Sequence, residues 1–275
     1  MSSWSQLSVL DDIAPLVMGG LAIGGFLAGI LAGFLGIGGG TILVPLMVTL
    51  GFAPVQAVAT SSLAILITSL SGSLQNWRMG YLRFPQVLAL GLPALLTAQI
   101  GAFLANYIAP YLLLLAFGLV LWLNIALMQL RRSLLAAAVP PQARLNPRLA
   151  QLLTGGGAGL LAGLFGVGGG VVLVPLQMLF LGEAIKMAIQ TSLAVIVMTA
   201  ISAAFGHAWN GHVLVWPGLL LGTGGLLGAQ VSTRFLPKLP DRAIAIAFCT
   251  LLTLLSGYTF WQAWRSYLAV GAIAL

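Results

Sequence analysis

The chain has 275 residues, of which 60% are hydrophobic and only 5% are charged, and its mean hydropathy is +1.09. Because a soluble domain carries about a quarter charged residues, this composition excludes a soluble globular protein and predicts one integral membrane unit. The net charge of +7 is spread over short connections rather than gathered on one helix, which argues against nucleic acid as a partner. The single cysteine, Cys249, can form neither an intramolecular disulfide nor a metal site by itself.

Hydrophobic segments follow one another along the whole chain. They are 14–36, 40–53, 55–76, 84–109 and 111–130, then 149–166, 170–181, 185–206, 213–236 and 243–264. A helix that spans a membrane needs about 20 apolar residues, so we predict half-length or re-entrant helices at 40–53 and 170–181. Residues 131–148 are basic and contain prolines. We predict that they form a cytoplasmic linker between a first repeat (1–130) and a second repeat (149–275).

A glycine-rich motif occurs twice in the chain. It reads GFLGIGGGTILVPL at Gly33–Leu46 and GLFGVGGGVVLVPL at Gly163–Leu176, and 11 of the 16 positions in Leu31–Leu46 are identical in Leu161–Leu176. Each copy ends an apolar helix, interrupts it with glycines and resumes with a short apolar segment. Broken helices at corresponding positions of two related halves are typical of membrane transporters, where they form the binding site.

The basic residues predict how the two halves are oriented. Nine of the 11 Lys and Arg residues lie in the connections 77–83, 131–148 and 234–242, which the positive-inside rule places in the cytoplasm. The counterpart of the first connection, 207–213, has no Lys or Arg, and the counterpart of the last, 106–111, is uncharged. Equivalent connections then face opposite sides, so we expect inverted repeats with both termini on the side opposite the cytoplasm.

The helix starts that follow the glycine interruptions are the first candidate site. The unpaired N–H groups and the dipole of a helix N-terminus favour an anion, and two such ends brought together by symmetry would hold one without a buried lysine. The glycines could equally serve close helix crossing. The candidate substrate-binding residues here are Gly38, Gly39, Gly40, Thr41, Gly168, Gly169 and Gly170.

Polar side chains on the neighbouring segments are the second group of candidates. Hydroxyls and amides can bind an oxyanion, or they can join helices by hydrogen bonds. These candidates are Thr60, Ser61, Ser62, Gln99, Gln190, Thr191, Ser192 and Gln230. At segment ends, Asn76, Arg78 and His207 are candidates for a gate or, in the case of the histidine, for a proton-linked group. Because no carboxylate lies inside a segment, we do not expect proton coupling through a buried acid.

The repeated GIGGGTILVP and GVGGGVVLVP motifs, followed by AVATSSLAI and MAIQTSLAV, resemble the sulfite exporter TauE/SafE family of bacterial membrane transporters. The resemblance runs from about Leu27 to Trp261. It implies an inner-membrane transporter for small sulfur-containing anions, such as sulfite or short organosulfonates like sulfoacetate. The two motifs differ at Thr41 and Val171, so the half-sites are chemically unequal, which suits an asymmetric solute.

The sequence therefore predicts an all-α polytopic membrane protein that exports a small anion by alternating access, with one inverted repeat rocking against the other. Uptake of thiosulfate or another sulfur anion, and an anion channel, stay open as alternatives. Because the chain carries no enzyme motif, we do not expect an enzyme, a cofactor or a metal. The expected partners are a small anionic solute and membrane lipids, and the oligomeric state is left open.

Overall fold

The computed structural model describes residues 15–105, 107–136, 146–209 and 211–273. The described residues form α-helices and one short 3-10 turn. These are α2 (Pro15–Leu35), α3 (Gly40–Thr49), α4 (Pro54–Arg78), α5 (Phe84–Ala105), α6 (Pro110–Ala136), α7 (Pro147–Phe165), α8 (Gly170–Phe180), α9 (Ile185–Trp209), α10 (Val215–Phe235), η1 (Leu236–Lys238) and α11 (Asp241–Ile273). Helix α6 includes the first residues of the predicted linker, and linker residues 137–145 lie outside the described residues.

The lengths of the helices confirm a multi-pass, all-α membrane protein. Six described helices, α2, α4, α5, α6, α9 and α11, are long and apolar enough to cross a membrane. The glycine-rich helices α7 and α10 have 19 and 21 residues. Helices α3 and α8, which follow the glycine interruptions, have only 10 and 11 residues. At ~1.5 Å per residue they reach about half of a ~30 Å hydrocarbon core, so the two predicted half-length helices are confirmed.

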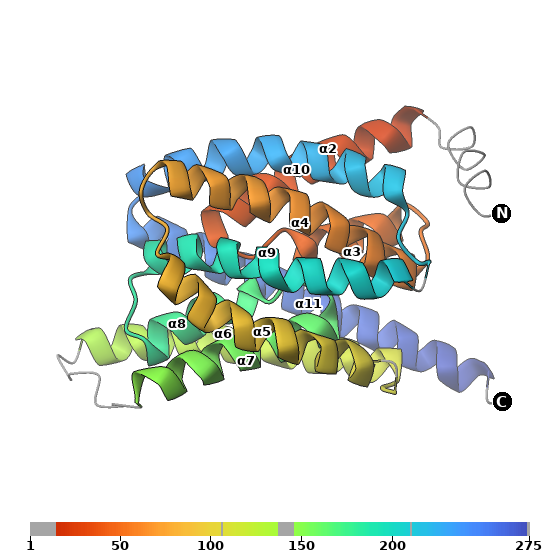
Figure 1. The fold of residues 1–275 in the computed structure, drawn as a ribbon. Coiled ribbons are helices and arrows are strands. Elements are labelled where there is room, and N and C mark those ends of the chain that lie inside the picture. Colours follow the sequence, from red (N-terminus) through yellow and green to blue (C-terminus); the bar gives the residue numbers. More distant parts are fainter. Residues whose placement is uncertain (1–14, 106, 137–145, 210, 274–275) are drawn as a thin grey trace.

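Corresponding helices of the two sequence halves run in opposite directions. Helix α2 runs from right to left in Figure 1 and α7 from left to right, and the same holds for α4 and α9. An inverted repeat requires this arrangement. The helix ends at Arg78, Phe84, Pro147, Ile185 and Asp241 all lie at the left of Figure 1. We call this the basic end, because most of the basic residues flank these helix ends.

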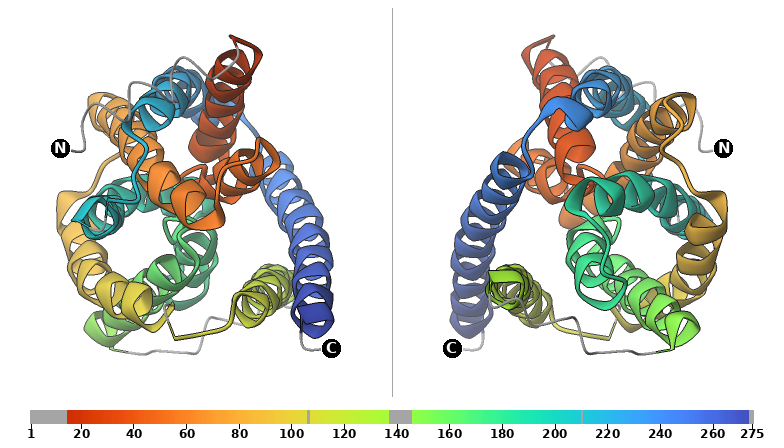
Figure 2. Two further views of the ribbon diagram at one scale, coloured as in Figure 1. Left: turned by 90° about the vertical axis from the view of Figure 1, so that its right-hand side faces the viewer. Right: turned by 90° about the vertical axis from the view of Figure 1, so that its left-hand side faces the viewer.

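Helices are exchanged between the two sequence halves. Helix α2 packs mainly against α10, and α5 packs mainly against α7. Helices α4 and α9 cross in the middle, while α6 and α11 form a pair at one side, as Figure 2 shows. We call α2, α3, α4 and α10 the first bundle, and α5, α7, α8 and α9 the second bundle. Each bundle therefore contains helices from both halves of the chain.

Glycines allow the exchanged helices to pack backbone against backbone. A Cβ atom added at Gly159 or Gly163 of α7 would collide with the carbonyl oxygen of Ala94 or Ala98 of α5. In the first bundle, a Cβ atom at Gly25 of α2 would collide in the same way with a carbonyl oxygen of α10. Small residues at interfaces are how membrane helices gain close van der Waals contact.

Gly159→Ala should destabilise the protein by about 1–3 kcal/mol, because the new methyl group must push α5 and α7 apart. Gly156→Ala on the same helix is the matched control, because its nearest neighbour would be a methyl group of Thr97 at 3.7 Å. There the substitution should be neutral or slightly stabilising, since alanine favours helix over glycine. Thermal unfolding of the purified variants in detergent measures both effects. Equal melting temperatures would contradict the close packing.

Candidate anion-binding site at the glycine interruptions

Each glycine interruption is a short left-handed stretch between two helices. The backbone angle φ is +75° and +82° at Gly38 and Gly39, and +80° and +77° at Gly168 and Gly169. Side chains with a Cβ atom rarely adopt these angles, so glycine is required here. Helices α3 and α8 begin directly afterwards, and their N-cap glycines supply no side-chain hydrogen bond.

The two interruptions lie against each other in the interior of the protein. A Cβ atom at Gly170 would collide with the carbonyl oxygen of Gly36, and one at Gly40 would lie 3.3 Å from the Cα atom of Val167. All of residues 36–41 are buried. The structure therefore brings the N-termini of α3 and α8 together, although they are 130 positions apart in the sequence.

The amide groups at these two N-termini lack partners. Within the part of the chain that the structure describes, nothing accepts a hydrogen bond from the N–H groups of residues 38–41 or 168–171. The first paired amides are those of Ile42, which donates to Gly39 O at 3.0 Å, and Val172, which donates to Gly169 O at 3.1 Å. Buried N–H groups require an acceptor, and the helix dipole favours a negative one. The geometry can therefore hold a small anion with backbone amides.

Two isoleucines fill the space between the interruptions. A Cβ atom at Gly38 would lie 3.1 Å from Cγ2 of Ile196 and 3.3 Å from Cγ2 of Ile65, and one at Gly168 would lie 3.4 Å from both. Sequence reasoning missed these residues, because isoleucine in an apolar segment carries no sign that it lies at the centre. Both isoleucine side chains therefore pack against the glycines of the two interruptions.

A small cavity adjoins the second interruption. Its lining consists of Ser62, Ile65, Ala98, Ala162, Gly163, Gly166, Gly168, Thr199, Ala200 and Ala203. Only about 10 Å³ of it is open to the centre of a water molecule, which is room for about one water. Thr199 donates a hydrogen bond to the carbonyl oxygen of Gly168 at 3.3 Å. Of the predicted site residues, Ser62 and Gly168 line this cavity.

The two predicted serines nearest the interruptions are already bonded. Ser192 Oγ lies 2.8 Å from the carbonyl oxygen of Gly36 and also 2.8 Å from Ile189 O of its own helix, so its one hydroxyl hydrogen is shared between α9 and the first interruption. Ser62 Oγ donates to Val58 O of its own helix at 3.0 Å. Ser192 is therefore a support of the first interruption, whereas the bond of Ser62 is local to α4.

Other predicted polar residues join helices. Thr60 Oγ1 accepts the N–H of Leu214 at the start of α10, at 3.0 Å, and Ser61 Oγ lies 3.9 Å from the sulfur of Met47. Gln99 is exposed and donates to Ser202 O at 3.0 Å, and Gln230 donates to Ser71 O at 3.5 Å. For these four residues the structure shows the helix-joining alternative.

Several predicted residues are buried without a partner. Within the described residues, this holds for the side-chain oxygens of Thr41, Gln190 and Thr191 and for both polar atoms of the Asn76 amide. Thr41 adds a hydroxyl to the amides of the first interruption, because it is the second residue of α3. The three predicted gate residues are not brought together. Asn76 and the exposed Arg78 lie at the basic end of α4, whereas His207 is half-buried near the opposite end.

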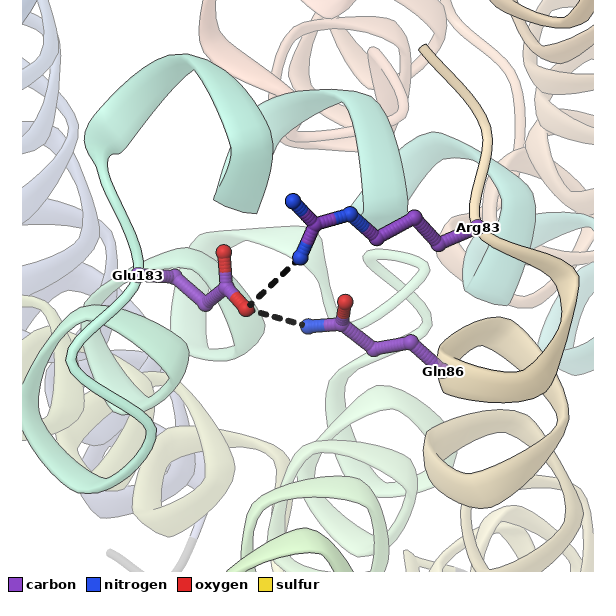
Figure 3. A network of polar contacts seen from close by, with 3 residues as sticks. All are labelled: Arg83, Gln86 and Glu183. Atoms are coloured by element: carbon purple, nitrogen blue, oxygen red, sulfur yellow. Dashed lines mark hydrogen bonds and ion pairs between the residues drawn. The ribbon is translucent and has the colours of Figure 1, made fainter.

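A polar network joins the start of α5 to the connection between α8 and α9, as Figure 3 shows. Gln86 donates to Glu183 Oε1 at 3.0 Å, and a guanidinium nitrogen of Arg83 lies 3.9 Å from the same oxygen. Next to it, Lys186 pairs with Asp241 at 3.4 Å. Sequence reasoning missed these contacts, because they join connections that lie about 50 to 100 residues apart and no local pattern reports such pairs.

Ser192→Ala should lower the stability of the protein by about 1–3 kcal/mol, because it leaves the buried carbonyl of Gly36 without its donor. Ser62→Ala should lower the stability by a smaller amount. The carbonyl that Ser62 contacts belongs to its own helix and also accepts a backbone hydrogen bond of that helix. The melting temperatures of the two variants in detergent give the comparison. An equal loss in both would show that Ser192 does not support the interruption.

Comparison with known proteins bears directly on this site. A protein family described as "Sulfite exporter TauE/SafE" matches residues 21–259. "Probable membrane transporter protein YdhB" of Bacillus subtilis (strain 168) is 30% identical over 219 residues, which is 78% of this chain and 89% of the relative. "Probable membrane transporter protein ORF9" of a Sinorhizobium species is 30% identical over 227 residues, which is 82% of this chain and 85% of the relative. No solved structure matches the chain.

The family match includes both glycine interruptions and the helices that surround them. The relatives are similar over most of their own length, so the likeness concerns the whole architecture and not one motif. The chain therefore belongs to the sulfite exporter TauE/SafE family and is a membrane transporter.

Proposed function

We propose that this transporter exports small sulfur-containing oxyanions, such as sulfite or sulfoacetate, from the cytoplasm of a bacterium across its inner membrane. One observation carries the proposal: two half-helix N-termini touch, and the amides of residues 38–41 and 168–171 have no acceptor among the described residues. An oxyanion fits because its charge is spread over several oxygens, each of which can accept an N–H. The description of the matched family supports the choice of anion.

The absence of buried charge near the site suits a carrier. No Lys, Arg, Asp or Glu side chain is buried among the residues that the structure describes. A site of neutral amides holds a small anion more weakly than an arginine pair would, because amides lack the full positive charges that attract the anion by Coulomb energy. Weak binding allows release, which transport requires as much as capture.

The two half-sites differ at one position. Thr41 places an unpartnered hydroxyl at the start of α3, whereas Val171 places an apolar side chain at the start of α8. A solute with oxygens on one side and a lone pair or carbon substituent on the other matches this difference. Sulfite and the organosulfonates have this shape.

Movement of one bundle against the other would open the site. Ile65 belongs to α4 of the first bundle and Ile196 to α9 of the second, so sliding the bundles separates the two side chains that close the centre. The moving units are then the bundles, rather than the two halves of the sequence. By the positive-inside rule the basic end faces the cytoplasm, where its arginines meet lipid phosphates, and both termini are periplasmic.

Gly39→Val and Gly169→Val should each abolish sulfite transport in proteoliposomes while the protein still inserts. A side chain there is strained and disturbs the start of a half-helix. Gly182→Val is the matched control, because φ at Gly182 is +68° and its added Cβ would meet nothing within 4 Å. It should carry the same backbone strain and keep transport. Unchanged transport in both test variants would refute the proposed site.

Export predicts that inverted membrane vesicles accumulate labelled sulfite or sulfoacetate faster than right-side-out vesicles, because their cytoplasmic face is outside. The rate should saturate with solute concentration, since a closed centre admits one anion per cycle. Faster accumulation of sulfite or thiosulfate in right-side-out vesicles would identify an uptake system. A rate that rises without saturation would identify a channel.

A further inference from the structure

Among the residues that the structure describes, four buried polar side chains of the second bundle carry an oxygen without a partner, and two of them, Gln190 and Thr191, are also candidates for the anion site. Gln177 and Thr154 are 0% exposed, Thr191 is 1% exposed and Gln190 is 2% exposed. Within the described residues, the Oε1 atoms of the two glutamines and the Oγ1 atoms of the two threonines have no hydrogen-bond partner. Because an unpaired buried oxygen is costly, an occupant that pairs with these four oxygens would stabilise the second bundle.

Helical register places these side chains in one layer. Leu173, Ala158 and Val195, from three different helices, pack in one apolar cluster. Each of these residues has a polar neighbour four positions away on its own helix, one turn nearer the basic end. Gln177 is the neighbour of Leu173, Thr154 that of Ala158 and Thr191 that of Val195. Residues four apart share one face of a helix. We therefore infer that the polar side chains lie at one level, one turn beyond the residues that the cluster brings together.

A hydrogen bond supports this register. Gln177 Nε2 donates to the carbonyl oxygen of Ala188 at 3.2 Å, so the end of the glutamine side chain lies against α9. Ala188 is three residues before Thr191, on the same face of that helix. Gln190 lies four residues before Ala194, another member of the same cluster, and so belongs to the same layer.

The layer is electrostatically suited to a cation. The unpartnered carbonyl oxygens of Gln177 and Gln190 can only accept. Helix α8 ends at Phe180, and a helix C-terminus carries negative partial charge. The N–H of Glu183 donates to the backbone oxygen of Gln177 at 3.3 Å, which places Glu183 just beyond the polar layer. Its carboxylate is the one that contacts Gln86 and Arg83 in Figure 3.

We propose that Thr154, Gln177, Gln190 and Thr191 form a binding site for a dehydrated alkali cation, with Na⁺ as its ion. Oxygen ligands without a carboxylate in the layer match a monovalent ion, because Ca²⁺ and Mg²⁺ sites use carboxylates. Half-helix C-termini are used for cations in discontinuous transporter helices. The site itself stands without the anion, but its use in coupled transport rests on the proposed function.

The first bundle has no such site. The positions 130 residues earlier are Gly24, Met47, Thr60 and Ser61. Thr60 already accepts the N–H of Leu214 at 3.0 Å, and Ser61 contacts Met47 at 3.9 Å. The cation site therefore lies only on the basic end. Helix α8 then holds the anion at its N-terminus and the cation near its C-terminus at Gln177, seven residues after Gly170, which is about 10 Å at 1.5 Å per residue.

Thermal unfolding of the purified full chain tests the site without any sulfur anion. Melting temperatures are compared in NaCl, KCl and choline chloride at equal ionic strength. Na⁺ should raise the melting temperature by about 3 °C in a saturable way. Gln177→Met, which copies Met47, and Thr191→Val should lose this shift, whereas Thr191→Ser should keep it. Thr154→Val is a second test if one of these variants fails to fold.

The outcomes separate the site from its use. Equal melting temperatures of the unmodified protein in all three salts, as expected of a layer that holds only water, would overturn the site. A shift that persists in both Gln177→Met and Thr191→Val would overturn it as well. In proteoliposomes, sulfite transport should depend on Na⁺ in the unmodified protein. A Na⁺ shift without this dependence keeps the cation site and overturns the coupling, and Gly169→Val tests the anion site independently.

Discussion

A backbone N–H group inside a membrane must have an acceptor, and this constraint governs the centre of the protein. The left-handed glycines at 38–39 and 168–169 interrupt two helices in the interior of the protein, where Gly38, Gly39 and Gly169 are buried and Gly168 is partly buried. Their carbonyls and amides must therefore find partners within the protein or in a solute. Ser192 satisfies the carbonyl of Gly36. The remaining amides point to a ligand, and the surrounding helices hold the two interruptions against each other.

Close packing makes this meeting of two distant segments possible. Glycines on α7 and α2 bring these helices into backbone contact with α5 and α10, so each interruption is anchored by a helix from the other sequence half. Ile65 and Ile196 then occupy the crossing of α4 and α9 and close the centre with apolar groups. Two apolar side chains can separate without breaking hydrogen bonds, which suits a gate between two rigid bundles.

The sequence alone predicted the membrane class, the half-length of α3 and α8 and the glycine interruptions, because all three depend on local composition and length. It did not predict that α2 pairs with α10, because hydrophobic periodicity does not identify the partner of a helix. Residues such as Gln177 and Ile65 were missed for the same reason, since their roles arise from neighbours on other helices. Of the predicted polar residues, Gln99 and Thr60 join helices, which a sequence pattern cannot distinguish from lining a site.

The exchange of helices also dictates the order in which the protein can be built. Among the described helices α2 leaves the ribosome first, but its main partner α10 begins 200 residues later, at Val215. At about 5–20 residues per second, α2 waits roughly 10–40 s in the lipid before its glycine face is covered. The N-terminal half cannot reach its final packing alone, so the first bundle is completed only after α10 has been synthesised.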